Sequence, residues 1–181
     1  MIPQLAEKWR ILEAERNSFW QIIEQASPRQ QVFKPAPDTW SMLEVAQHIV
    51  ASEKGTLSFL KNRPPVKPDS WSQKIKSAWR AFMLKNALRL PFKFKAPNVP
   101  GLSPTAIIPK EDTQVEWQQV REGLEAYLAA FPADQMTYIV FKHPVGGKFT
   151  LSQTIDSFLL PHIRHHKTQL NRIAQSEGFP S

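Results

Sequence analysis

The sequence predicts an all-α protein built as a four-helix bundle, and three observations support this fold class. Apolar residues recur at spacings of three to four along several long segments, as in helices that bury one face. Two of these segments begin with a capping box, in which Ser or Thr precedes Glu by three residues. A long proline-rich stretch, about residues 64–111, separates the second expected helix from the third, and such a crossover can join neighbouring helices that run parallel.

Residues 3–26 form the first expected helix. Its inner positions are apolar and mostly three or four residues apart: Leu5, Trp9, Leu12, Phe19 and Ile23. The prolines of residues 27–37 then predict a connection rather than a further helix. The second expected helix begins at the capping box of Ser41 and Glu44, and it ends before Pro64.

The stretch between the second and third helices is expected to be a basic, proline-rich insertion. It contains a helical excursion over residues 70–90, followed by an extended crossover. Residues 61–110 hold 11 of the 23 Lys and Arg residues but only Asp69 among the acids, a formal net charge of +10. The basic character of the chain is therefore local.

Aromatic residues interleave with these cations: Trp71, Trp79, Phe82, Phe92 and Phe94. A segment of this kind can contact an anionic ligand, a membrane surface or single-stranded nucleic acid. We favour a simpler interpretation, in which the aromatic side chains pack on the bundle and the cations face water. Binding of nucleic acid or another anion through residues 61–110 is accordingly the weakest of the interpretations of function.

The third expected helix begins at a second capping box, formed by Thr113 and Glu116, and continues to Phe131. Residues 136–141 are short and rich in β-prone side chains, which predicts one extended segment. Residues 143–147 contain a proline and two glycines and predict a turn.

The last expected helix is capped by Thr150 or Ser152 and runs to about Ser176. It carries three of the five histidines of the chain. His162 and His166 are four residues apart, which on a helix leaves them separated by about 40° and about 6 Å of rise, on one face. Such a pair can bind one metal ion.

His165 is an alternative partner for His162, because a spacing of three residues also brings helical side chains together. The helix register favours His166, which continues the inward stripe of Ile155 and Leu159. His165 lies about 100° away from that position, and we expect it at the surface or in an interface.

His48 is the expected third ligand, because it lies on the apolar side of the second helix and bundles build metal sites from inward side chains. A lone histidine there would more often be a hydrogen-bonded core residue, but the pair on the last helix favours a ligand.

His143 is expected to border the pocket without binding. Two polar residues are near by spacing and can support a ligand or move a proton: Glu44, whose capping role already explains it, and Gln169. No catalytic residue is assigned.

The composition excludes several classes of site. The chain has no cysteine, so disulfides, thiolate ligands and a cysteine nucleophile are excluded. With 181 residues, 41% of them hydrophobic and 22% charged, we expect one globular domain over residues 1–181. No stretch is typical of a signal peptide or a membrane span, so a cytoplasmic protein is expected. Imidazole ligands suit Zn, Ni, Cu or Fe rather than Mg or Ca.

Three segments together resemble the DinB/YfiT-like superfamily. They are residues 38–49 (DTWSMLEVAQHI), 143–147 (HPVGG) and 160–170 (LPHIRHHKTQL). The resemblance spans nearly the whole chain. It implies a four-helix bundle with a long crossover that holds one divalent metal, often nickel or zinc, through one histidine of the second helix and two of the last. The matching positions in this sequence are His48, His162 and His166.

The resemblance also implies an activity. It indicates a metal-dependent hydrolase that activates water, or a transferase that activates a low-molecular-weight thiol, acting on an unidentified small-molecule substrate, and a possible homodimer. The alternative is a metal-stabilised binding or stress-response protein without turnover. A fourth protein ligand, such as His143 or His165, would favour that alternative, because closed coordination is typical of structural sites.

Overall fold

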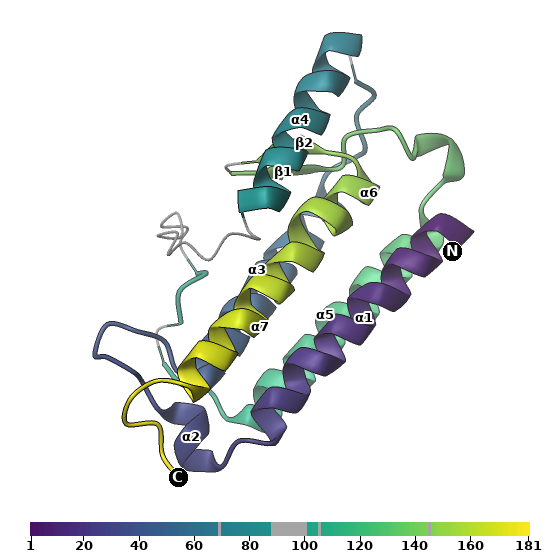
Figure 1. Cartoon of the computed structure of the whole chain (residues 1–181). Coiled ribbons are helices and arrows are strands. Elements are labelled where there is room, and N and C mark those ends of the chain that lie inside the picture. The colour runs from purple at the N-terminus through teal and green to yellow at the C-terminus, as the bar shows by residue number, and fades with distance from the viewer. Residues whose placement is uncertain (69, 88–100, 105, 145) are drawn as a thin grey trace.

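The structure is a computed structural model that describes residues 1–68, 70–87, 101–104, 106–144 and 146–181. Four long helical rods lie side by side in it (Figure 1). They are α1 (Pro3–Glu24), α3 (Met42–Asn62), α5 (Lys110–Ala130) and a last rod composed of α6 (Leu151–Thr154), η2 (Ile155–Leu159) and α7 (Leu160–Ala174). The predicted all-α four-helix bundle is confirmed.

The long crossover connects two helices that run parallel, as its length predicts. Near the start of α3, the Gln47 side chain donates to the carbonyl of Ile108, just before α5, at 3.1 Å. Near the end of α3, Leu57 packs where a side chain at Gly123, late in α5, would lie. The two helices therefore advance together, and α1 and α7 lie along the opposite side of the bundle (Figure 1).

The capping boxes at Ser41 and Thr150 are both present. The Ser41 hydroxyl accepts from the Glu44 amide, and the Glu44 carboxylate accepts from the Ser41 amide at 2.8 Å. Thr150, rather than Ser152, caps the last rod in the same reciprocal way with Gln153. These contacts satisfy amides that the first helical turn leaves free.

The capping box expected at Thr113 is wrong. The helix α5 begins earlier, at Lys110, directly after Pro109. Thr113 is 1% exposed, and its hydroxyl donates to the Pro109 carbonyl at 3.0 Å. Two acidic residues in the first turn, Glu111 and Asp112, favour this earlier start through the helix dipole.

The connection after α1 contains a short helix that the sequence interpretation missed, α2 (Pro28–Val32). Ser27 and Gln30 form its capping box, and Pro28 occupies its first turn. Proline is favoured at that position, because the first amides of a helix have no intrahelical partner. Pro28 therefore begins a helix in a stretch whose prolines predict only a connection.

The chain between α5 and the last rod forms a 3-10 turn, η1 (Ala133–Gln135), and then a hairpin of β1 (Phe141–His143) and β2 (Gly147–Phe149). The single extended segment expected over residues 136–141 is present only in its second half: residues 136–138 form a turn and a bend, Ile139 makes an isolated antiparallel bridge with Val66, and the strand begins at Phe141. Gly147 has φ +83°, which only glycine adopts readily, and the turn is where it was predicted.

The helical excursion is α4 (Trp71–Ala87), which packs on β2 and η2 at one end of the bundle (Figure 1). Our expectation that its aromatic residues pack on the bundle is wrong for Trp79 and Phe82, which are 63% and 62% exposed. Phe92 and Phe94 lie outside the described residues. Among the described helices, none combines the length and apolarity needed to cross a bilayer.

A buried ion-pair network crosses the core between α1, α3 and α5. Arg121 and Glu53, each 1% exposed, are joined by two hydrogen bonds of 2.8 and 2.7 Å. Arg121 also donates to Glu13 at 2.9 Å, and the Trp117 indole donates to Glu53 at 2.8 Å. The guanidinium and the Glu53 carboxylate are thus both satisfied, as buried charges require.

Candidate metal centre

A π-helical segment, η2, directly precedes the part of the last rod that carries the candidate ligands. In η2 the Leu160 amide donates to the Ile155 carbonyl, five residues back, which is the π-helical pattern. Pro161 follows at once and has no amide hydrogen, so it cannot continue an α-helical ladder with Ser157. The π segment ends at Leu159, two residues before Pro161.

The helix α7 turns His162 and His166 towards the interior. They are 8% and 7% exposed, and Leu170 and Ile173 continue their buried stripe. His165 is half-buried at the side of the helix. The helix register therefore selects His166 rather than His165, as the apolar spacing predicts.

His48 on α3 meets this pair. Its Nε2 lies 3.2 Å from Nε2 of His162, and Nε2 of His166 lies 3.1 Å from the same atom. One ring nitrogen of each of the three lies within 4.8 Å of the others. His48 is 5% exposed, so three imidazoles from two facing helices converge in the protein interior.

Two oxygen atoms fix the orientation of the rings. Nδ1 of His48 lies 2.8 Å from the backbone carbonyl of Leu102, and Nδ1 of His166 lies 2.7 Å from the amide oxygen of Gln169. A carbonyl oxygen only accepts, so each Nδ1 carries the hydrogen and donates. In a neutral imidazole the Nε2 atom then keeps its lone pair. Both lone pairs point into the cluster.

Burial keeps the cluster neutral. Desolvation lowers the pKa of His166 to about 3, with a further contribution from nearby His48, and it lowers the pKa of His162 well below its usual value. The pKa of His48 is also lowered, mainly by burial. Neutral imidazoles are the protonation state that binds metals.

Aromatic rings wall the cluster. Trp40 lies over His48, with ring centroids 4.8 Å apart, and Phe158 stacks on His162 at 5.2 Å. The sequence interpretation missed both as site residues, although Phe158 precedes His162 by one helical turn. His143 packs on Phe158 at 4.5 Å and does not belong to the three-histidine group. It borders the site, as expected.

Glu44 and Gln169, the two polar residues expected near the ligands, differ in what they contact. The Glu44 carboxylate is occupied by the Ser41 amide and by the Lys34 ammonium, which lies 2.7 Å away. Its position is explained by capping and by this ion pair, so it serves the helix start rather than the cluster. Gln169 contacts a cluster histidine directly through the 2.7 Å hydrogen bond to His166.

A family model described as the DinB superfamily matches residues 11–170. The chain belongs to the DinB superfamily. It is also similar to a solved structure described as "Crystal structure of TT2238, a four-helix bundle protein", with 17% identity and a TM-score of 0.59, covering 92% of this chain and 98% of that chain. At this identity the likeness shows the fold alone. Comparison with curated proteins finds no match.

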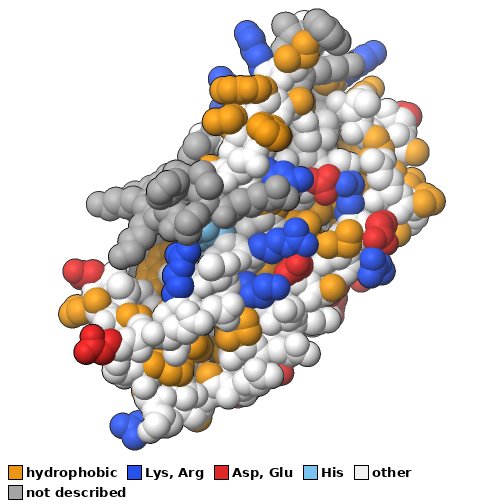
Figure 2. All heavy atoms as spheres, viewed as in Figure 1, with side chains coloured by type: hydrophobic (Ala, Val, Ile, Leu, Met, Phe, Trp, Pro, Cys, Tyr) orange, Lys and Arg blue, Asp and Glu red, His pale blue; other side chains and the backbone are white. Residues whose placement is uncertain are grey.

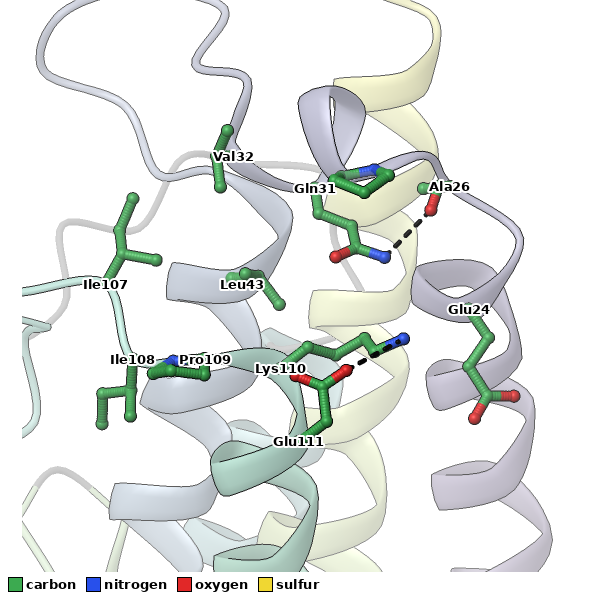
Figure 3. A pocket seen from close by; sticks show the side chains of 11 residues that line it. Glu24, Ala26, Gln31, Val32, Leu43, Ile107, Ile108, Pro109, Lys110 and Glu111 are labelled. Carbon is green, nitrogen blue, oxygen red and sulfur yellow. Dashed lines mark hydrogen bonds and ion pairs between the residues drawn. The ribbon is translucent and has the colours of Figure 1, made fainter.

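This DinB-superfamily chain has a separate cavity of about 590 Å³ where α2 and the starts of α3 and α5 meet (Figure 3). Apolar side chains and the Lys110–Glu111 ion pair line it. None of the three cluster histidines does. The cavity is therefore distinct from the candidate metal centre.

Proposed function

We propose that this chain binds one divalent transition metal through His48, His162 and His166 and is a metal-dependent enzyme. The observation that carries the proposal is the convergence of three neutral ring nitrogens within 4.8 Å of one another. The expected reaction is hydrolysis of a small molecule or transfer of a low-molecular-weight thiol. DinB-superfamily membership supports both.

The spacing of the nitrogens fits one ion. Two imidazole nitrogens bound at about 2.0–2.1 Å to a tetrahedral zinc are about 3.3–3.4 Å apart, and a narrower angle at the metal brings them slightly closer. The Nε2 separations of 3.2 and 3.1 Å from His162 are close to that value. Without an ion, the Nε2 lone pairs of His48 and of His166 both face Nε2 of His162, which can donate only one hydrogen.

The number of ligands favours catalysis over a purely structural role. Structural zinc sites usually have four protein ligands, whereas catalytic sites have three and leave a position open. In the part of the chain that the structure describes, the group of candidate ligands contains three residues. A metal held there by neutral ligands would polarise a substrate carbonyl or lower the pKa of water or a thiol.

The residues around the cluster have separate tasks. The Leu102 carbonyl and Gln169 hold two imidazoles in the tautomer that exposes Nε2, which raises ligand basicity. Trp40 and Phe158 cover two of the rings with apolar surface and keep water from the backs of these ligands. Substrate specificity then depends on which molecules can reach the open coordination position of the metal from the side that Trp40 and Phe158 do not cover.

A direct test is turnover after reconstitution with Zn or Ni. The protein would be assayed with chromogenic esters and amides, and with glutathione plus a chromogenic electrophile. We expect activity that needs added metal, is lost in His166→Ala and is retained in the adjacent matched variant His165→Ala. Metal-independent activity, or equal loss in both variants, would contradict the proposal. Stoichiometric binding without turnover on any of these substrates would favour the non-catalytic alternative.

A further inference from the structure

The outward face of α4 carries large apolar side chains that nothing in the described residues covers. Ile75, Trp79, Phe82 and Met83 are 46%, 63%, 62% and 48% exposed. Isolated exposed apolar residues are ordinary, but a cluster of four on one helix marks an interaction surface. We call these four residues the α4 stripe.

Helical geometry makes the stripe continuous. At about 100° per residue, positions 75, 79, 82 and 83 fall within about 100° of one another. The opposite side of the helix is already packed, since Ala81 is 3% exposed and Leu84 lies against the hairpin at Gly146. The helix thus has one apolar face towards the protein and a second one towards solvent.

Cations flank the stripe, and acids are absent from the helix. The sequence of α4 contains four basic residues and no Asp or Glu: Lys74, Lys76, Arg80 and Lys85. By the same geometry, Lys76 falls beside one edge of the stripe and Lys85 beside the other. Arg80 extends over the hairpin turn at Gly147. The surface is therefore apolar in the middle and positive at its borders.

The stripe lies on a protruding part of the molecule. In Figure 1, α4 stands at the end of the bundle where α6 begins, and Figure 2 shows hydrophobic and basic side chains gathered there. Nucleic-acid-binding proteins that use aromatic stacking place the strand in a positive groove. A convex helix with Ile and Met beside Trp and Phe does not provide such a groove.

We infer that the α4 stripe and its flanking cations dock this protein on an anionic membrane surface. Interfacial helices combine Trp, Phe and aliphatic side chains on one face with Lys and Arg beside them. The apolar side chains enter the boundary between headgroups and acyl chains, and the cations contact lipid phosphates. Each cation near such a surface strengthens binding about fivefold. The charge of α4 makes an anionic bilayer the matching partner.

The test is co-sedimentation of the whole protein with vesicles of phosphatidylcholine alone or mixed with phosphatidylglycerol. We expect binding to the anionic vesicles that weakens as salt rises, and little binding to neutral ones. Lys76→Glu should weaken binding at least about fivefold. The double change Trp79→Ser and Phe82→Ser should abolish it, whereas Val115→Ser, which removes a 57% exposed residue of α5, should not change it.

Other occupants give different results. Absence of binding to anionic vesicles, or unchanged binding by the double variant, would overturn the inference. A dimer in light scattering that Trp79→Ser dissociates would assign the stripe to a second copy instead, and salt-sensitive binding of single-stranded DNA without vesicle binding would assign it to nucleic acid. The inference is independent of the metal centre, so His166→Ala should retain vesicle binding.

Discussion

Nδ1 of His48 lies 2.8 Å from the carbonyl oxygen of Leu102, a residue of the crossover 54 positions further along the chain. The backbone of the crossover thereby fixes which nitrogen of a helix α3 histidine carries hydrogen. A connection that is long for topological reasons also orients a candidate ligand.

The first prediction concerns the ring hydrogen of His48. In metal-free protein at neutral pH, nitrogen-resolved NMR should find His48 protonated at Nδ1 and bare at Nε2. His143 is the internal control, because its Nδ1 accepts from the Gly146 amide at 2.9 Å and its hydrogen must be on Nε2. Finding His48 protonated at Nε2 would contradict the orientation that we assign to the cluster.

The second prediction concerns Gln169. Replacing it with Leu removes the acceptor 2.7 Å from Nδ1 of His166. Such supporting contacts are typically worth about 10–100-fold in metal affinity. Competition titration with a chromogenic chelator should show a loss of that size in Gln169→Leu. The exposed Gln119→Leu on α5 should bind as wild type, and equal affinity of the two variants would remove Gln169 from the account.

The third prediction is a pH dependence that arises from His143. Burial lowers its pKa to about 4, below the usual value of 6.5. Between these two values the unfolded state binds more protons, so the free energy of unfolding falls as pH decreases, by up to about 1.4 kcal/mol per pH unit. His143→Gln should therefore show a shallower decline than wild type between about pH 6.5 and 4 in urea unfolding. A steeper or identical decline would contradict burial of a neutral His143.

The fourth prediction concerns the core ion pair. Glu53→Gln leaves the Arg121 guanidinium without its main buried counter-charge, and breaking such a pair costs about 3–5 kcal/mol. Glu116→Gln is the matched control, because Glu116 pairs with Lys54 at the surface, where the two side chains are 35% and 65% exposed. That change should cost less than about 1 kcal/mol. Similar midpoints in urea would show that the buried network does not stabilise the fold as argued.

Much of the fold could be predicted from the sequence because it depends on local patterns. Apolar spacing located α1 and α3, and the reciprocal contacts of Ser41 with Glu44 are local. The same pattern at Thr113 predicted the wrong helix start. The helix α5 begins one turn earlier, directly after Pro109, and Thr113 is buried. A capping box can be read from sequence only when no stronger start signal precedes it.

The candidate site was predictable in part for the same reason. Helix periodicity is sufficient to bring His162 and His166 to one face, and the apolar stripe of α3 includes His48. The Leu102 carbonyl and the stacking of Trp40 depend on how distant segments meet, which no local pattern encodes. The exposure of Trp79 likewise follows from which face of α4 meets the hairpin.

Binding of one metal ion by the three histidines can be measured by elemental analysis of the purified, tag-free protein after incubation with Zn or Ni and gel filtration. We expect about one ion per chain in wild type and in His165→Ala, and almost none in His48→Ala, His162→Ala or His166→Ala. Folding of each variant would be verified by circular dichroism. A full equivalent of metal retained by folded His48→Ala and His162→Ala, or no metal in wild type after reconstitution, would contradict this expectation.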